Sequence, residues 1–583
     1  FWHLTNSIID ESFAEEVDAE IVWVGGAYRH AVEDREVILE DISKTAVVSF
    51  LLVLGLLFLA FRDLRALVIL FVPLLFGALA TWGFAAIAIG ELNTFTSTFT
   101  AILFGLGVDF SIHIYLRYKE ELADSPDVQE AILRAMKQAG PPCITAAITS
   151  AGGFLALRFA GFVGFQQLGI LLAVGVLFCL FSVLSLLPLL IQQFDRNIPG
   201  EAVKGLEIKP KIGLPYRYSA PLFALLTAMA VLAWTVIPQI DFEYDLSELR
   251  PDGFAYDELT EEERLVARKS FRPLVVSLNS EEELLRKYSE LEEIIQRKQN
   301  PYFQTVFSIY SMLPSDQSDR LLLLEELQDL IQQSNIQYLP PTIQSNLRQL
   351  QQMKIEAIDP KDLPEQVTGI LGVSKGKHRL ILMPDGNMWN IRENAYLADE
   401  VDQFFGKEAS VASEYLAMAS LFRLIQSDGM KISLLALLLV FLFSLLDIKS
   451  LRRAISSVGI LLIGMSWAGA GLYLCDIKLS LVNFVAIPII MGIGIDVIIH
   501  LLHRISEEGP GRIRIALERT GFAAFVSSAT TVLSFSALLF ARNRGLHSLG
   551  EMVVVGLIVL TMVSFLAVPI GWMAIWWRRK NRC

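Results

Sequence analysis

Two short segments place ionisable residues in apolar surroundings with the same spacing. GLGVDFSIHIYLRY begins at Gly105 and GIGIDVIIHLLHRI begins at Gly492; each reads G-x-G-x-D, then His four residues later and Arg four residues after that. A carboxylate inside a bilayer costs about 2.5–3.5 kcal/mol on insertion scales, so its recurrence indicates a function. We predict that Asp109 and Asp496 bind and release protons. The alternative is a structural polar group that is hydrogen-bonded to a neighbouring helix.

The histidines of the pattern, His113 and His500, lie one helical turn after the aspartates and therefore on nearly the same helix face. Imidazole titrates near neutral pH, so an Asp–His ladder is suited to relaying protons. A merely interfacial or hydrogen-bonding role stays open for both histidines. No metal site is predicted on either segment. The arginines, Arg117 and Arg504, are expected to face lipid head groups.

The glycines of the pattern, Gly105, Gly107, Gly492 and Gly494, predict close helix packing, because small residues let membrane helices approach each other. Two such helices side by side would bring the two aspartates near a common axis. Dinucleotide binding is excluded, because the third glycine of that motif is missing and the segment does not follow a strand.

The next apolar segment of each half is rich in hydroxyl groups. These side chains are expected to hydrogen-bond the aspartates or to line a polar path, and bonding to their own helix backbone is an equal alternative. The residues concerned are Thr145, Thr149, Ser150, Ser527, Ser528, Thr530 and Thr531.

Membrane-spanning helices must position these groups. The chain has 583 residues, of which 53% are hydrophobic, and a mean hydropathy of +0.48. Stretches of about 20 apolar residues are typical of helices that cross a bilayer. Eleven spans are predicted, at 44–61, 66–89, 95–116, 141–159, 165–192, 219–238, 429–446, 453–475, 480–502, 521–541 and 547–577.

Lysine and arginine gather in the short loops on one side of these spans, which predicts that this side is cytoplasmic. The N-terminal 43 residues and the long region 239–428 then lie outside. In that region, 272–278 and 378–384 are predicted strands, and helices are predicted from the capping box at Ser280 to about Lys298 and near 391–405. This alternation indicates an α/β or α+β domain.

The two halves of the chain are duplicates. A shift of 387 places Asp109 on Asp496, and a shift of 381 places Thr149 on Thr530. Parallel repeats of this kind predict a pseudo-twofold axis along the membrane normal. The predicted parts are 1–43, the end of a first outer domain; 44–195, the first membrane repeat; 196–218, a cytoplasmic linker; 219–238, a further span; 239–428, the second outer domain; 429–577, the second repeat; and 578–583, a basic tail.

The sequence also disfavours several functions. It has no basic patch for nucleic acid, no Walker A motif, no Ser/His/Asp arrangement and no CxxC pair. We therefore expect a protein that is not an enzyme and that uses no cofactor, with protons as the coupling ion.

Taken together, the duplicated GLGVDFSIHIYLRYKEE and GIGIDVIIHLLHRISEE, Ala135 to Gly140, and EYDLSELRP at 243–251 resemble the resistance–nodulation–division (RND) superfamily. The symmetric aspartates look most like its MmpL and hopanoid-transporter branch, which is similar to the sterol-sensing proteins. One departure is that Phe110 and Val497 stand where MmpL proteins have tyrosine. The resemblance implies a polytopic α-helical bundle with a porter-like outer domain, of which this fragment would hold helices two to twelve of twelve.

As function, the resemblance implies a proton-driven exporter of a lipid or other hydrophobic molecule in a bacterial inner membrane. A sterol- or lipid-sensing protein or scaffold without net transport is the alternative, and a protein-translocation accessory is a third. The expected partners are membrane lipids or a hydrophobic small molecule, without nucleic acid. A homodimer or homotrimer and envelope accessory proteins stay open.

Overall fold

The computed structural model separates the chain into two compact units, residues 1–260 with 423–583 and residues 261–422. The predicted linker 196–218, apart from Tyr218, lies outside the described residues, as do 1–26 of the predicted first outer domain and 581–583 of the tail. The structure describes residues 27–124, 127–195, 218–250, 273–314, 316–334, 338–354, 356–371, 378–384, 389–406, 409–509 and 512–580.

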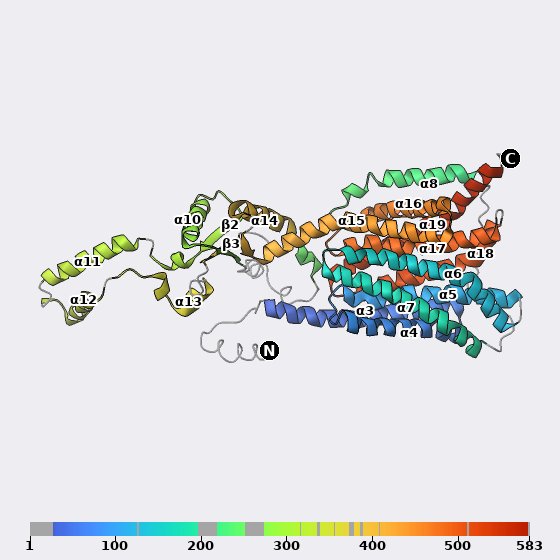
Figure 1. Ribbon diagram of the computed structural model, residues 1–583, viewed down its shortest axis with the longest axis horizontal. Helices are drawn as coiled ribbons and strands as arrows, with labels where there is room; N and C mark the ends of the chain where they lie inside the picture. The colour runs from blue at the N-terminus through green and yellow to red at the C-terminus, as the bar shows by residue number, and fades with distance from the viewer. Residues whose placement is uncertain are drawn as a thin grey trace. The chain divides into compact units, whose positions relative to one another are not determined.

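Among the described residues, eleven helices are long and apolar enough to cross a membrane, as the sequence predicts, and they lie in the first unit except for the start of α15. Four of them begin well before their predicted spans, α3 at Ala27, α6 at Val128, α15 at Glu414 and α18 at Ile513. In chain order the helices are α3 Ala27–Phe61, α4 Leu64–Ala88, α5 Phe99–Asp124, α6 Val128–Leu155, α7 Val163–Phe194, α8 Ser219–Ala233, α15 Glu414–Ile448, α16 Leu451–Leu474, α17 Ala486–Glu508, α18 Ile513–Ser536 and α19 Arg544–Lys580 (Figure 1).

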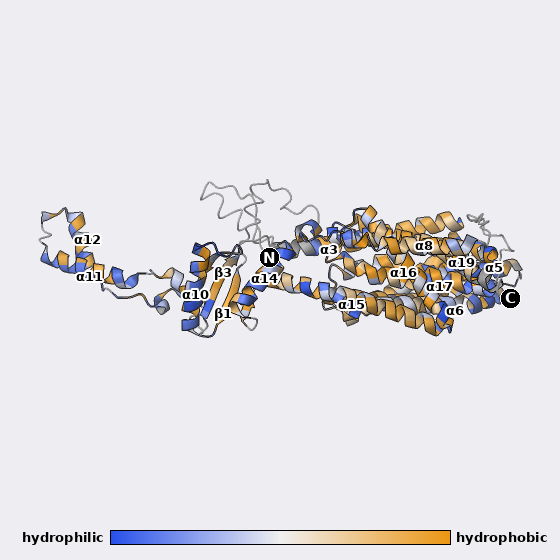
Figure 2. Cartoon of the chain, turned by 90° about the horizontal axis from the view of Figure 1, so that it is seen from above, coloured by the Kyte–Doolittle hydropathy of each residue, from blue (hydrophilic) through white to orange (hydrophobic). Residues whose placement is uncertain are grey.

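The helices that carry the aspartates are the most buried of the bundle. In α5 and α17, 89% and 83% of the apolar stretch is buried, against 17% in α8 and 22% in α15. α5 packs against α18, and α17 packs against α6, so each aspartate helix lies beside a helix of the other repeat. Hydrophobic residues cover most of the bundle (Figure 2), as expected for helices that face hydrocarbon.

One end of the bundle carries the loops in which lysine and arginine gather. The C-terminal ends of α5 and α17 meet there through an ion pair between Arg504 and Glu120, and Arg453 near the start of α16 reaches Ser506 of α17. This end, called the basic end below, carries the loops that the sequence predicts to be cytoplasmic.

The second unit is built on a four-stranded antiparallel sheet in the order β2-β3-β1-β4, which makes it an α+β domain. Its strands are β1 Leu274–Leu278, β2 Phe303–Phe307, β3 His378–Pro384 and β4 Ser410–Ala412. Its helices are α10 Glu281–Gln296, α11 Gln317–Gln333, α12 Pro341–Gln352, α13 Glu365–Ile370 and α14 Ile391–Phe405.

The predicted elements at 272–278, 281–298, 378–384 and 391–405 are confirmed as β1, α10, β3 and α14. Ser280 caps α10 by accepting a hydrogen bond from the backbone N–H of Glu283, as its place in the capping box predicts. Val276 of β1 and Leu380 of β3 lie in one hydrophobic core with Leu291 of α10 and Leu397 of α14. Residues of both helices thus cover an apolar face of the sheet.

Candidate functional site

Asp109 of α5 is held by two hydroxyl groups of α18. Thr530 Oγ1 donates to Asp109 Oδ1 at 2.8 Å, and Thr531 Oγ1 donates to Asp109 Oδ2 at 2.9 Å. Both carboxyl oxygens of this intramembrane group therefore have a hydroxyl partner. The partners come from the second repeat, whereas Asp109 belongs to the first.

Asp496 of α17 makes the reciprocal contact. Ser150 Oγ of α6 lies 2.8 Å from Asp496 Oδ2 and 2.9 Å from the carbonyl oxygen of Gly492. Each aspartate is thus bonded to the hydroxyl-rich helix of the opposite repeat. The sequence indicates that hydroxyls and aspartates belong together, but it does not indicate this crossing of repeats.

The two crossings differ in one bond. Thr149 occupies the position of Thr530 under the 381-residue shift, but Thr149 Oγ1 and Asp496 Oδ1 are both buried without a hydrogen-bond partner among the described residues. These two atoms are the counterparts of the bonded pair Thr530 Oγ1 and Asp109 Oδ1. Buried polar atoms are rarely left unsatisfied. The second crossing therefore has one hydrogen bond fewer than the first. Below, the second is called the open crossing and the first the closed crossing.

The hydroxyls at Asp109 also have a backbone acceptor within reach. The carbonyl oxygen of Ser527 lies 2.6 Å from Thr530 Oγ1 and 3.2 Å from Thr531 Oγ1. A hydroxyl has one proton to donate, so an ionised Asp109 competes with this carbonyl for each threonine proton. A protonated Asp109 donates to one threonine, which is then free to donate to Ser527. Both alternatives that the sequence leaves open, bonding to aspartate and bonding to the own helix, are present here.

The side chain of Ser527 also acts on Asp109, whereas two other hydroxyl groups of the predicted region lie elsewhere. Ser528 Oγ donates to the carbonyl oxygen of Ala524 in its own helix. Thr145 Oγ1 donates to Asp447 Oδ1 of α15 at 2.6 Å, and the other oxygen of Asp447 lies 2.6 Å from His503 Nε2. Thr145 thus belongs to a separate polar group with Asp447 and His503.

The glycines of the motif allow the close approach of helices, but α5 and α17 do not meet through them as expected. A Cβ on Gly105 would lie 2.6 Å from Ser534 Cβ of α18, and a Cβ on Gly492 would lie 3.3 Å from the carbonyl oxygen of Ser150 in α6. Gly107 and Gly494 instead face α4, α7, α16 and α19 of their own repeats. The two glycines of each motif lie on different faces of their helix, and other helices fill both faces. The expected glycine contact between α5 and α17 is therefore not formed.

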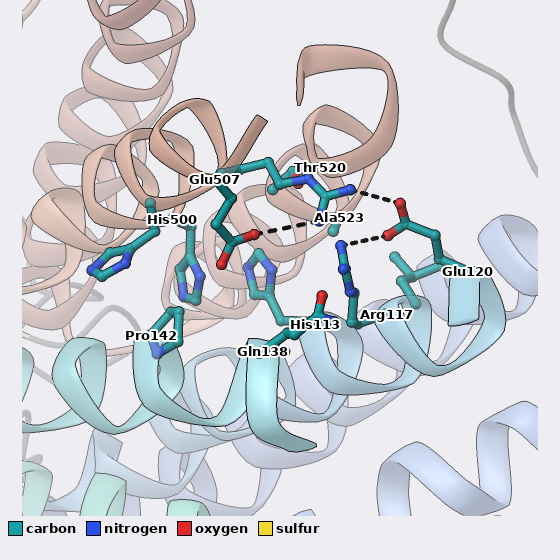
Figure 3. A pocket seen from close by; sticks show the side chains of 13 residues that line it. His113, Arg117, Glu120, Gln138, Pro142, His500, Glu507, Thr520 and Ala523 are labelled. Carbon is teal, nitrogen blue, oxygen red and sulfur yellow. Dashed lines mark hydrogen bonds and ion pairs between the residues drawn. The ribbon is translucent and has the colours of Figure 1, made fainter. Parts of the chain in front are cut away.

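α5 and α17 meet at their histidines. The rings of His113 and His500 are stacked, with centroids 3.9 Å apart and an angle of 6° between their planes. Both side chains line a pocket of about 60 Å³ at the basic end, shown in Figure 3. This pocket is large enough to hold water, since a site for one water molecule needs about 10–15 Å³. No hydrogen bond joins either histidine to an aspartate among the described contacts.

The arginines of the motif do not face head groups, which corrects the expectation from the sequence. The side chain of Arg504 is only 7% exposed and contacts Glu120 of the other repeat at 2.6 Å. Arg117 contacts the second oxygen of Glu120 at 3.0 Å and Glu121 at 2.8 Å. Figure 3 shows Glu120 facing the guanidinium group of Arg117. The glutamates that follow each arginine in the motif supply partners that keep it inside the bundle.

A further pair of crossed contacts lies at the opposite end of the bundle and is absent from the sequence predictions. Asp41 of α3 accepts hydrogen bonds from the backbone N–H groups of Arg542 and Asn543, at 2.7 and 3.0 Å. Asp428 of α15 accepts one from the N–H of Gly161 at 2.8 Å. The 387-residue shift places Asp41 on Asp428, so the duplication itself was the signal that could have identified this pair.

Comparisons with known proteins agree with this architecture. Residues 9–206 and 383–582 match the MMPL family. The hopanoid transporter HpnN of Rhodopseudomonas palustris is 22% identical over 590 residues, which cover 88% of this chain and 64% of that protein. HpnN of Burkholderia multivorans is 32% identical over 156 residues, 27% of this chain and 18% of that protein. The chain therefore matches less than two thirds of the length of either relative.

A third relative is the apo-petrobactin exporter of Bacillus anthracis, which is 28% identical over 238 residues, 36% of this chain and 32% of that protein. Among solved structures, SecDF from Thermus, a translocon-associated membrane protein, superposes with a TM-score of 0.57 over 93% of this chain and 62% of that one. At 15% sequence identity, this likeness shows the fold alone.

Proposed function

We propose that this chain, which belongs to the MMPL family, is the membrane part of a proton-driven exporter that moves a lipid or other hydrophobic molecule out of a bacterial inner membrane. The observation that carries the proposal is the crossing of the aspartates, in which each carboxyl group is bonded to hydroxyls of the opposite repeat. The names of the relatives, hopanoid transporter and apo-petrobactin exporter, support a hydrophobic or small-molecule substrate.

The crossing gives protonation a direct effect on the contact between repeats. An ionised aspartate accepts the hydroxyl protons, whereas a neutral one donates and releases a threonine to its own backbone. Hydrogen bonds to charged groups contribute about 1.5–3 kcal/mol, against about 0.5–1.5 kcal/mol for neutral ones. A proton moving down a membrane potential of 100 mV releases about 2.3 kcal/mol. The energy released by one proton is therefore comparable to the cost of replacing one or two charged hydrogen bonds by neutral ones.

In the transport cycle that we propose, the two crossings correspond to two states of the contact between an aspartate and the opposite repeat. The first repeat's aspartate is fully bonded, while Asp496 Oδ1 and Thr149 Oγ1 lack partners among the described residues. In the proposed cycle the second crossing closes as the first opens, and the repeats rock against each other about the pseudo-twofold axis. The histidine-lined pocket at the basic end would supply water and protons from the cytoplasmic side.

Lipid efflux from proteoliposomes tests the proposal. The whole protein would be reconstituted with a radiolabelled hopanoid as the probe, and efflux to an acceptor would be measured with and without an imposed pH gradient. The proposal predicts efflux that depends on the gradient and stops when an ionophore collapses it. Hopanoid binding with no effect of the gradient would contradict the proposal and favour a lipid-sensing protein or scaffold.

A further inference from the structure

A second cavity lies away from the aspartates, among α8, α16, α17 and α19. Its volume is about 1040 Å³, which is at the upper end of the roughly 300–1,000 Å³ typical of small-molecule sites. Its walls include the apolar side chains of Phe223, Ile460, Ile463 and Val568. The cavity is therefore suited to hydrocarbon rather than to a water-soluble metabolite.

The end of this cavity at the basic end of the bundle is cationic. Arg452 and Arg453 line it together with Ser450, Ser456 and Ser506, and no acidic residue is among its described lining residues. The Arg453 guanidinium lies 6.0 Å from the centre of the Trp572 ring, and Trp572 Nε1 is buried without a described hydrogen-bond partner. An amphiphile with an anionic head and an apolar tail complements this distribution of charge and hydrocarbon.

The duplicated half offers an internal comparison. Under the 387-residue shift, Asp63, Arg65 and Ala66 correspond to Ser450, Arg452 and Arg453. Asp63 caps α4, because its Oδ1 accepts from the N–H of Arg65 at 2.9 Å. Ser450 precedes α16 without a side-chain cap. The second half thus lacks this carboxylate and has one more arginine, which makes the start of α16 favourable for an anion.

We propose that this cavity binds an anionic phospholipid from the leaflet at the basic end, with its phosphate at Arg452 and Arg453 and an acyl chain along α8 and α19. Gly459 lies in the cavity wall, and an added Cβ there would meet no atom within 4 Å, so the space for a chain is open. The proposal does not depend on proton coupling, because none of these residues contacts either aspartate crossing.

Native mass spectrometry of the whole protein, titrated with dioleoylphosphatidylglycerol or dioleoylphosphatidylcholine, tests the assignment. Each basic residue near an anionic surface contributes about 1 kcal/mol. The double variant R452Q/R453Q should therefore bind the anionic lipid about thirtyfold more weakly, since 1.4 kcal/mol corresponds to a factor of about ten. Gly459→Leu should weaken the binding of both lipids, because its side chain fills the cavity.

Two control variants match these changes. R65Q removes the equivalent arginine of the first half, and Gly55→Leu adds the same side chain at a glycine whose Cβ also meets nothing within 4 Å. Both control variants should bind phosphatidylglycerol as the wild type does. The two controls and the two cavity variants should all have the unfolding temperature of the wild type. Equal losses in R65Q and R452Q/R453Q would overturn the proposal. Displacement of the lipid by millimolar inorganic phosphate would also overturn it and indicate a site for a soluble anion.

Discussion

The unequal crossings predict unequal costs when their hydroxyls are removed. Replacing Thr530 and Thr531 together by valine keeps the size of both side chains but deletes both hydrogen bonds to Asp109. Removing one partner of a buried hydrogen bond costs about 1–3 kcal/mol, so the double variant should be destabilised by about 2–6 kcal/mol. The matched change in the other half, T149V/S150A, removes one hydroxyl partner of Asp496, that of Ser150, which also lies near the carbonyl oxygen of Gly492, and should cost about 1–3 kcal/mol.

The assay is chemical unfolding of the purified whole protein in one detergent, followed by tryptophan fluorescence. T149V alone serves as the control, because Thr149 Oγ1 is buried and has no partner in the described structure; removing this hydroxyl should leave the stability unchanged or raise it by up to about 1–3 kcal/mol. Equal destabilisation by the two double variants, or a cost for T149V as large as for T530V, would refute the inference that the first crossing is the closed one.

The remaining predictions concern both ends of the bundle. R504Q removes one guanidinium from the buried network around Glu120, so the free energy of unfolding should fall by about 3–5 kcal/mol. The control R297Q breaks an exposed ion pair with Glu293 and should change the free energy of unfolding by less than about 1 kcal/mol. Asp41→Ala leaves two backbone N–H groups without their carboxylate and should destabilise the protein by about 2–6 kcal/mol. Asp428→Ala leaves only one N–H group without its carboxylate and should destabilise the protein less in the same unfolding assay. H113Q/H500Q should lower proton-driven efflux at least tenfold and change its pH profile if the stacked rings relay protons, whereas an unchanged pH profile would leave the histidines a packing role only.

The sequence was sufficient to predict the membrane fold because its main signals are local. Long apolar stretches predict the eleven helices, and alternation and capping residues predict β1, α10, β3 and α14. The strand order β2-β3-β1-β4 was not predictable in the same way, since it depends on pairing between segments far apart in the chain.

The candidate site was only partly predictable for a related reason. Helical periodicity indicates which face Asp109 occupies, but it does not indicate which helix covers that face, so the crossing to Thr530 was missed. The expectation for Arg504 failed because its partner, Glu120, belongs to the other repeat. The duplication contains part of the missing information, as the equivalence of Asp41 and Asp428 illustrates.

The central claim is that protons act through the two crossed aspartates. The most direct measurement is gradient-driven hopanoid efflux from proteoliposomes containing the whole protein as wild type, D109N or D496N. Asparagine preserves the size and much of the hydrogen bonding of aspartate but does not exchange a proton at physiological pH. We predict that both variants fold and insert yet lose efflux driven by the gradient. Full efflux in both single variants would contradict it.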